Sequence, residues 1–383
     1  MSEFSSILET VRSHYGDGFV PLHAPCFRGE EKAKLIDCVD STFVSSVGRY
    51  VDEFEQQIAQ FTGAKYAVAV VNGTLGLMLA MRVAGIQSGD LVLTQSLSFV
   101  ATANAISMLG AEPLFLDVDS ASLGMSADDL EDFLATQTEH KNGHLIHKAS
   151  GKPIRGCVPM HTLGFPCEID SIAALCQKYG IALIEDAAES LGSFYKGKHT
   201  GTFGEIGVFS FNGNKILTTG GGGILVTDNE RLAREARHLS TTAKKPHAWL
   251  FEHDEIAYNL RMPNLNAALG VAQLQQLPDF LREKRKLADF YQEAFSNSQG
   301  FSFLVESDNT QANYWLNAVK FDQAESAQAF LTDSNAQDIQ TRPLWTPMHQ
   351  LDIYRHCLKT EMINTDSLAS RVVNLPSGVL CRE

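Results

Sequence analysis

The sequence lacks the marks of several common protein classes. Its seven cysteines form no CxxC pair and no dense framework, and their number is odd, which favours reduced, mostly buried thiols over a disulfide scaffold or a zinc site. No run of about eighteen apolar residues is present, so no transmembrane helix is expected. The first residues have neither the basic start nor the apolar run of a signal peptide. We therefore expect a cytoplasmic protein without a membrane partner.

Positive charge is also scarce. The formal net charge is -14, which argues against non-specific binding to nucleic acid or to an anionic membrane. A local basic pocket for a phosphorylated ligand stays possible on an acidic protein. His140, His144 and His147 lie in a polar, glycine-bearing stretch (138–156) that has the composition of a solvated loop, so no metal site is assigned.

Two nucleotide-binding motifs are missing as well. Lys215 lies in a glycine-rich region, but it follows Asn214 and precedes Ile216, so the phosphate-loop pattern GxxxxGK[ST] is absent. The dinucleotide pattern GxGxxG is absent at the first strand-to-helix turn. The first absence argues against nucleotide binding by a phosphate loop, and the second argues against a nicotinamide-dependent dehydrogenase.

Strand-like and helix-like segments alternate between about residues 65 and 230. The expected strands cover 65–71, 90–95, 112–119, 157–162, 181–186, 205–211 and 222–228, and the expected helices cover 75–85, 99–110, 126–137 and 168–180. This order predicts a mainly parallel sheet with helices on both faces, and ligands beyond the carboxyl ends of its strands. Long helical stretches follow residue 230, a smaller α+β unit begins near 313, and 241–255 is loop-like.

Four features fall at or just past the ends of expected strands. Asn72–Gly73–Thr74 opens a helix and offers an anion site or simply a capped turn. Glu185 and Asp186 end one strand, where one of them faces a pocket or both face solvent. Phe99 either stacks on a flat ligand or belongs to the core. Lys215 precedes four glycines (220–223), which form a flexible turn or let the backbone pass close to a ligand.

Pyridoxal phosphate needs all four features. Its aldehyde forms a Schiff base with a lysine, its pyridine nitrogen pairs with an acid, its phosphate takes an anion site, and its ring takes a flat contact. Lys215, Asp186, Gly73–Thr74 and Phe99 supply these parts. The combination is far more specific than any single member.

The sequence resembles the sugar-nucleotide aminotransferases of the DegT/DnrJ/EryC1/StrS family from about residue 20 onward. The resemblance lies in FVSSVGRYVDEFE (43–55), in 99–119, in 184–215 and in 255–274. It implies an α/β chain of the aspartate-aminotransferase-like fold (fold type I), with a mainly parallel seven-stranded sheet. The expected domains are a large cofactor-binding domain (1–250) and a smaller α+β domain (251–383), and the N-terminal segment packs on the smaller one.

The resemblance also implies roles for individual residues. Lys215 is the Schiff-base lysine and Asp186 the partner of the pyridine nitrogen, while Ser210 joins Gly73 and Thr74 at the phosphate. Phe99 stacks on the ring, Glu189 positions the ring or its hydroxyl, and His161 lies near the cofactor. Asn259 matches an asparagine that reaches the phosphate from the neighbouring subunit, which implies a homodimer with shared active sites.

The implied reaction is transamination with pyridoxal or pyridoxamine phosphate as cofactor. L-glutamate is the donor, and the acceptor is the C4 keto group of a nucleotide-linked 4-keto-6-deoxy sugar. SSVGRY and the extra segment HKASGKPI (147–154) look most like the branch that acts on UDP-linked N-acetylhexosamines, so UDP is favoured over GDP or dTDP. The product would feed surface polysaccharide synthesis.

Other interpretations stay open. Some relatives carry histidine in place of the lysine and act as dehydratases, so Lys215 favours transamination over dehydration. A 3-aminotransferase and a non-catalytic sugar-nucleotide-binding regulator are the remaining alternatives. Lys244, Lys245 and Arg342 are candidates for holding the sugar diphosphate, or are plain surface charges.

Overall fold

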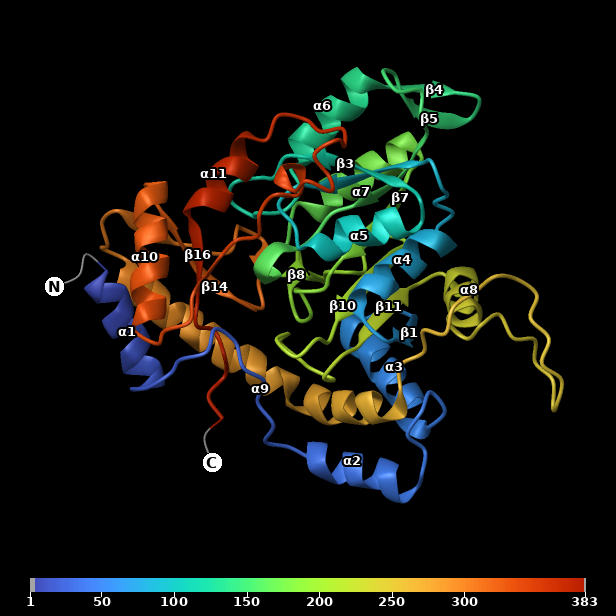
Figure 1. Ribbon diagram of the computed structural model, residues 1–383, viewed down its shortest axis with the longest axis horizontal. Helices are drawn as coiled ribbons and strands as arrows, with labels where there is room; N and C mark the ends of the chain where they lie inside the picture. Colours follow the sequence, from blue (N-terminus) through green and yellow to red (C-terminus); the bar gives the residue numbers. More distant parts are fainter. Residues whose placement is uncertain (1–3, 382–383) are drawn as a thin grey trace.

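The computed structural model describes residues 4–381, and a seven-stranded sheet is its largest element (Figure 1). The strands are β1 (Tyr66–Val70), β2 (Leu91–Gln95), β3 (Glu112–Leu116), β6 (Ile154–Val158), β7 (Ala182–Asp186), β10 (Ile206–Ser210) and β11 (Gly223–Thr227). Their order is β1-β11-β10-β7-β6-β2-β3. β11 runs antiparallel to β1 and β10, and every other neighbouring pair is parallel. The predicted mainly parallel sheet is confirmed.

Helices cover both faces of this sheet. α4 (Gly73–Val83), α5 (Val100–Met108) and α8 (Glu230–Ser240) pack on one face. The other face carries α3 (Arg49–Thr62), α6 (Ala127–Gln137), α7 (Ile169–Tyr179) and α9 (Asn264–Phe295). Side chains alternate along each strand, so in β1 Val68 joins the first of these cores while Ala67 and Ala69 join the second. Strands buried on both faces read as the nearly continuous apolar runs seen in the sequence.

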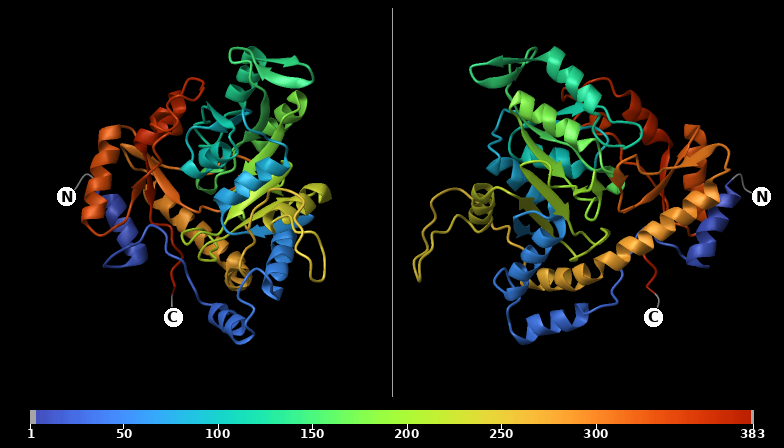
Figure 2. Two further views of the ribbon diagram at one scale, coloured as in Figure 1. Left: turned by 45° about the vertical axis from the view of Figure 1, so that its right-hand side comes forward. Right: turned by 180° about the vertical axis from the view of Figure 1, so that it is seen from behind.

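A second, antiparallel sheet lies at the far end of α9. It has the order β12-β14-β16-β15, with β12 (Phe301–Phe303), β14 (Asn317–Phe321), β15 (Arg342–Pro343) and β16 (Val372–Leu375). α10 (Ala324–Ala336) and α11 (Ile363–Arg371) pack on it, and α1 (Ser5–Tyr15) shares its core. We call this part the small unit. Figure 2 shows from behind how α9, which includes Pro278, runs along the main sheet and on to α1.

Shorter elements complete the described chain. They are α2 (Glu31–Asp40), β4 (Thr138–Lys141), β5 (His144–His147), β8 (Phe194–Tyr195), β9 (Lys198–His199), β13 (Thr310–Gln311) and the 3-10 turns Thr162–Gly164 and Met348–Gln350. β4 and β5 form an antiparallel hairpin, so the expectation of a plain loop over 138–156 is wrong there. The cause is pairing across a two-residue turn, Asn142–Gly143, with both residues at positive φ. Within residues 4–381, no helix has the length and apolar composition to cross a membrane.

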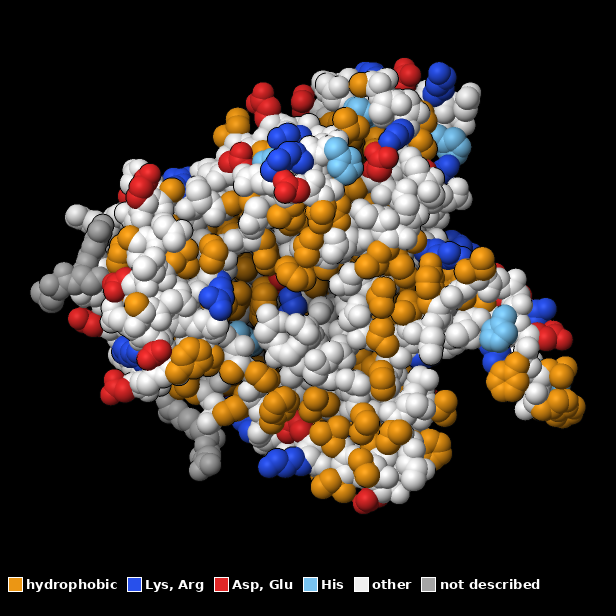
Figure 3. Space-filling model, viewed as in Figure 1, with side chains coloured by type: hydrophobic (Ala, Val, Ile, Leu, Met, Phe, Trp, Pro, Cys, Tyr) orange, Lys and Arg blue, Asp and Glu red, His pale blue; other side chains and the backbone are white. Residues whose placement is uncertain are grey.

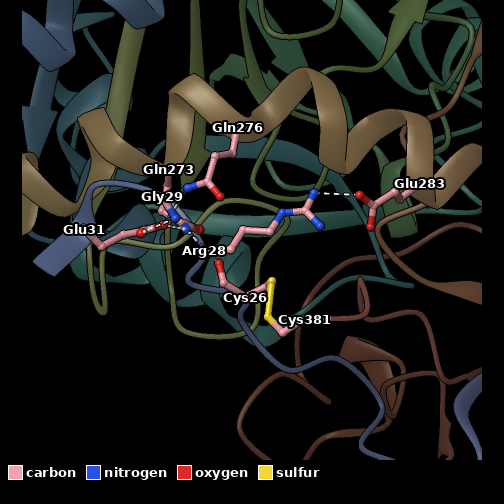
Figure 4. Close-up of a disulfide and its surroundings, with 8 residues drawn as sticks. All are labelled: Cys26, Arg28, Gly29, Glu31, Gln273, Gln276, Glu283 and Cys381. Atoms are coloured by element: carbon pink, nitrogen blue, oxygen red, sulfur yellow. Dashed lines mark hydrogen bonds and ion pairs between the residues drawn. A yellow bond between two sulfur atoms is a disulfide. The ribbon is translucent and has the colours of Figure 1, made fainter. Parts of the chain in front are cut away.

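The expectation that the cysteines are reduced is wrong for one pair. Cys26 and Cys381 form a disulfide whose Cα atoms are 5.5 Å apart (Figure 4). The N–H of Ser377 donates to the Leu22 carbonyl at 2.7 Å, so the two segments already run together before they reach the sulfur atoms. A separation of 355 residues leaves no pattern that sequence spacing could reveal. The five other cysteines are free.

Candidate active site

A cavity of about 330 Å³ opens at the carboxyl ends of β1, β7 and β10. Seven of the nine predicted site residues line it: Gly73, Thr74, Phe99, Asp186, Glu189, Ser210 and Lys215. His161 and Asn259 do not line it. Figure 3 shows this side of the molecule hollowed between the small unit and the main sheet, with hydrophobic side chains gathered around the hollow.

The start of α4 forms one end of the cavity. The Asn72 side chain accepts from the Leu75 N–H at 2.9 Å, and the Asn72 carbonyl accepts from the Gly76 N–H at 3.0 Å. The N–H groups of Gly73 and Thr74 are therefore left for a ligand. Ser210 ends β10 beside them, since a Cβ added to Gly73 would lie 3.0 Å from the Ser210 Cβ. A helix start whose N–H groups lie beside a serine side chain suits a phosphate group.

The glycine run beyond Lys215 has a packing reason at this end. A Cβ on Gly223 would lie 2.6 Å from the Asn72 carbonyl carbon and 2.7 Å from the Gly73 nitrogen. Only glycine lets β11 pass so close to the turn that opens α4. Gly221 and Gly222 line the cavity itself, which agrees with a backbone that approaches a ligand.

Asp186 lies on the cavity wall at the end of β7. Its Oδ2 accepts from the Thr102 hydroxyl at 2.6 Å, and its Oδ1 accepts from the Ala188 N–H at 3.1 Å. Burial raises the pKa of Asp186, and these two hydrogen bonds oppose the rise. A buried, ionised carboxylate is stabilised by a cationic N–H partner, such as a protonated pyridine nitrogen.

Glu185 and His161 lie behind the wall and contact each other. Glu185 is fully buried, and it accepts from the N–H groups of Gly201, Phe203 and Gly204 at 2.6–2.7 Å. The His161 Nε2 lies 3.0 Å from Glu185 Oε2. Glu185 therefore holds the 201–204 turn against β7, and Asp186 is the one of the two neighbouring acids that faces the cavity.

Lys215 and Glu189 meet inside the cavity. The Lys215 Nζ donates to Glu189 Oε1 at 3.1 Å, while Glu189 Oε2 accepts from the Leu163 N–H at 2.8 Å. Burial raises the pKa of Glu189, and the charge on Lys215 acts in the opposite direction. Glu189 thus ties the lysine to the segment that follows β6.

Sequence reasoning missed two tryptophans in the cavity. Trp315 precedes β14 and Trp345 follows β15, so both come from the small unit. The Trp345 ring lies 6.4 Å from the Phe99 ring, at an interplanar angle of 59°. A residue about 100 positions from the lysine, in a different unit, gives no local signal in the sequence.

The remaining candidates lie outside the cavity. Lys244 packs on the Phe251 ring and Lys245 lies 3.9 Å from Glu252, while Arg342 is an exposed residue at the edge of the small sheet. Asn259 is exposed at the base of the segment 241–259, which projects from the body of the molecule in Figure 1 and in the right-hand view of Figure 2.

One group of potential metal ligands was not anticipated. His238, Asp254 and Glu255 lie together near the base of the same projecting segment, and the His238 Nε2 is 2.7 Å from Asp254 Oδ1. All three side chains are at least partly exposed, and the hydrogen bond between the first two accounts for their proximity.

Known proteins with similar sequences and structures match almost the whole length of this chain. The model of the DegT/DnrJ/EryC1/StrS aminotransferase family matches residues 25–382. A GDP-perosamine synthase of Escherichia coli O157:H7 is 35% identical over 359 residues, covering 94% of this chain and 93% of the relative. The GDP-perosamine synthase of Vibrio cholerae is 36% identical, covering 94% of each chain. The aminotransferase TlmJ from Streptoalloteichus hindustanus has a similar structure, with a TM-score of 0.85, 29% identity and coverage of 94% of each chain.

Proposed function

Because the chain belongs to the DegT/DnrJ/EryC1/StrS aminotransferase family, we propose that it transfers the amino group of L-glutamate to the C4 keto carbon of a nucleotide-linked 4-keto-6-deoxy sugar. The enzyme is a sugar aminotransferase that uses pyridoxal phosphate. The observation that carries the proposal is the presence of Lys215, Asp186 and the start of α4 in one cavity. The products would be 2-oxoglutarate and an amino sugar nucleotide, and surface polysaccharide synthesis would consume the latter.

The residues in the cavity fit this cofactor, and we propose one role for each. Gly73, Thr74 and Ser210 hold the phosphate, Asp186 pairs with the pyridine nitrogen, and Phe99 contacts the ring. Bound there, pyridoxal phosphate supplies an electron sink for the carbon that loses its proton.

Lys215 carries the proton in this proposal. Its Nζ would take the proton from Cα of the donor and deliver it to C4′ of the bound cofactor, and it would make the same transfer in reverse for the acceptor. Glu189 lies within hydrogen-bond distance of that amine and orients it. The apolar walls that Leu77, Met160 and the two tryptophans supply keep water away from the reacting carbon.

For the nucleotide, two acceptors merit a test. The relatives from Escherichia coli O157:H7 and Vibrio cholerae are named for a GDP-linked product, which supports a GDP-linked keto sugar as the first candidate. Their names lend no support to the preference for UDP that the sequence resemblance favoured. The segment 147–154 and the SSVGRY stretch keep a UDP-linked N-acetylhexosamine as the second candidate.

A homodimer is part of the proposal. Asn259 lies outside the cavity of its own chain and at the base of a projecting segment, which supports contact with the cavity of a partner. Trp249, Phe251 and Ile256 are exposed on the same segment, and apolar side chains of this size favour burial against another chain. The cytoplasm stays the predicted location.

The experiment is an absorption spectrum of the purified protein, recorded before and after addition of L-glutamate. We expect the visible band of the bound cofactor to bleach with release of one 2-oxoglutarate, and to return when the correct keto sugar nucleotide is added. GDP- and UDP-linked 4-keto-6-deoxy sugars would be compared at equal concentration. Ammonia release without 2-oxoglutarate would favour the dehydratase alternative, and sugar binding without any amino transfer would favour the regulator.

A further inference from the structure

Trp315 presents the face of its ring to the amine of Lys215. The Nζ lies 4.0 Å from the ring centroid, within the range of a cation–π contact. The tryptophan is 4% exposed and lines the same cavity as the lysine. The amine therefore lies between a ring face on one side and the Glu189 carboxylate on the other.

Three hydrogen bonds fix the position of Trp315. Its Nε1–H donates to the carbonyl of Asn214 at 2.7 Å, and its backbone N–H donates to Asn313 Oδ1 at 2.8 Å. Its carbonyl accepts from Nζ of Lys284 at 3.0 Å, and that lysine lies fully buried in α9. The ring is thus held by the residue before Lys215 as well as by the small unit.

The chemistry of the contact suits a lysine that must move. The face of the indole ring attracts an ammonium group. It offers no lone pair, so it neither takes a proton from the amine nor fixes the direction of one N–H bond. A second carboxylate at this place would hold the amine far more strongly and raise the cost of each movement. The ring leaves the amine free to turn from Glu189 toward the cavity.

We propose that Trp315 is a positioning residue that keeps the Lys215 amine aimed into the cavity whenever that amine is not bonded to the cofactor. The inference rests on the role of Lys215 in the proposed function. Trp315 itself acts through the lysine and takes no part in bond making.

The test uses the full-length apoenzyme, prepared by removing the cofactor. Added pyridoxal phosphate forms a carbon–nitrogen bond between its aldehyde carbon and Lys215 Nζ, with loss of one water, and the absorbance change gives the rate constant. For Trp315→Leu we expect this rate constant and kcat to fall about ten-fold each, the scale of a partly desolvated cation–π contact. KM for L-glutamate should stay within about two-fold, since the ring does not select the substrate.

Conservative variants separate positioning from packing. Trp315→Phe keeps a ring face and should retain rates within about three-fold of the wild type. Replacing Trp315 alone by tryptophans with increasing fluorination keeps the shape and weakens the charge on the ring face, so both rates should fall stepwise. This series also serves if Trp315→Leu fails to fold.

A matched control uses another ring beside a lysine. Tyr179 lies 5.3 Å from the Lys178 Nζ at the end of α7, outside the cavity, so Tyr179→Leu should leave both rates unchanged. Rates of Trp315→Leu within about two-fold of wild type, or no trend with fluorination, would overturn the role of Trp315. If Lys215→Ala still acquires a cofactor bond that borohydride fixes, the assignment of Lys215 fails instead.

Discussion

Lys215 and Glu189 form an ion pair inside the cavity, with Nζ 3.1 Å from Oε1 and both side chains largely buried. The pair joins two segments that follow strands of the seven-stranded sheet, since Glu189 follows β7 and Lys215 follows β10. An amine in such a place is costly unless it is paired or used, and Glu189 supplies the pairing.

Replacing Lys215 removes both the cofactor bond and the proton carrier. Lys215→Ala should bind pyridoxal phosphate without a covalent link and lose at least about 1,000-fold in kcat. Mass spectrometry after borohydride treatment checks the bond, and 2-oxoglutarate release checks turnover. Lys178→Ala, at an exposed lysine of α7, is the control and should match the wild type. Normal turnover of Lys215→Ala would remove the proposed mechanism.

Adding one methyl group at Gly223 should weaken cofactor binding. The new Cβ would lie 2.6 Å from the backbone of Asn72, so the turn that opens α4 must shift. We expect the Kd for pyridoxal phosphate to rise about 10- to 100-fold, since a displaced helix start loses its hydrogen bonds to the phosphate. Equilibrium titration of the apoenzyme measures this. Gly213→Ala, which meets nothing within 4 Å, should leave the Kd unchanged, and equal affinities for both variants would contradict the proposed phosphate site.

Acid should destabilise the protein through His199. Its Nε2 accepts from the Gly192 N–H at 2.8 Å, and its Nδ1 lies 2.5 Å from the Thr200 carbonyl, so the buried ring is held neutral. Burial lowers the pKa of His199 to about 4, from 6.5 in the unfolded chain. Below about pH 6.5 the unfolded chain binds a proton at His199 that the folded protein does not bind. The free energy of unfolding therefore has its full value above about pH 6.5 and falls by about 3 kcal/mol toward pH 4.

Urea unfolding midpoints across this pH range measure the effect. His199→Gln should cost stability at pH 7 and reduce the loss between about pH 6.5 and 4, because the side chain no longer titrates. His140→Gln, in the exposed hairpin, should keep the wild-type slope. Identical slopes in all three proteins would show that His199 titrates normally.

Opening the disulfide should lower stability. The bond joins two residues that are 355 positions apart in the sequence. Cys26→Ser, or reduction of the wild type, removes this link, and we expect the free energy of unfolding to fall by about 2–4 kcal/mol. Thermal unfolding with and without a dithiol reductant measures it. Cys357→Ser removes a free thiol and should respond to the reductant as the wild type does. No effect of reductant on the wild type would contradict a role for the bond in stability.

Local patterns predicted the strands of the main sheet. The apolar run 65–71 contains β1, and Gly73 after β1 and Asp186 at the end of β7 lie in the cavity, as expected for the carboxyl ends of such strands. Contacts between distant segments were not predictable in this way. Trp315 reaches Lys215 through the small unit, and Cys26 meets Cys381 because the two ends of the described chain run side by side. Neither contact leaves a trace in periodicity or spacing.

The proline within α9 leaves one backbone hydrogen bond of that helix unmade. Pro278 has no N–H, so the Leu274 carbonyl lacks the hydrogen bond that a helix normally supplies. Gln273 and Gln276, which precede the proline, bind Glu31, and Lys284, which follows it, binds the carbonyls of Trp315 and Ser377. The helix nevertheless runs unbroken from Asn264 to Phe295, so one element connects the segment around Glu31 to the ring that lies against the amine of Lys215.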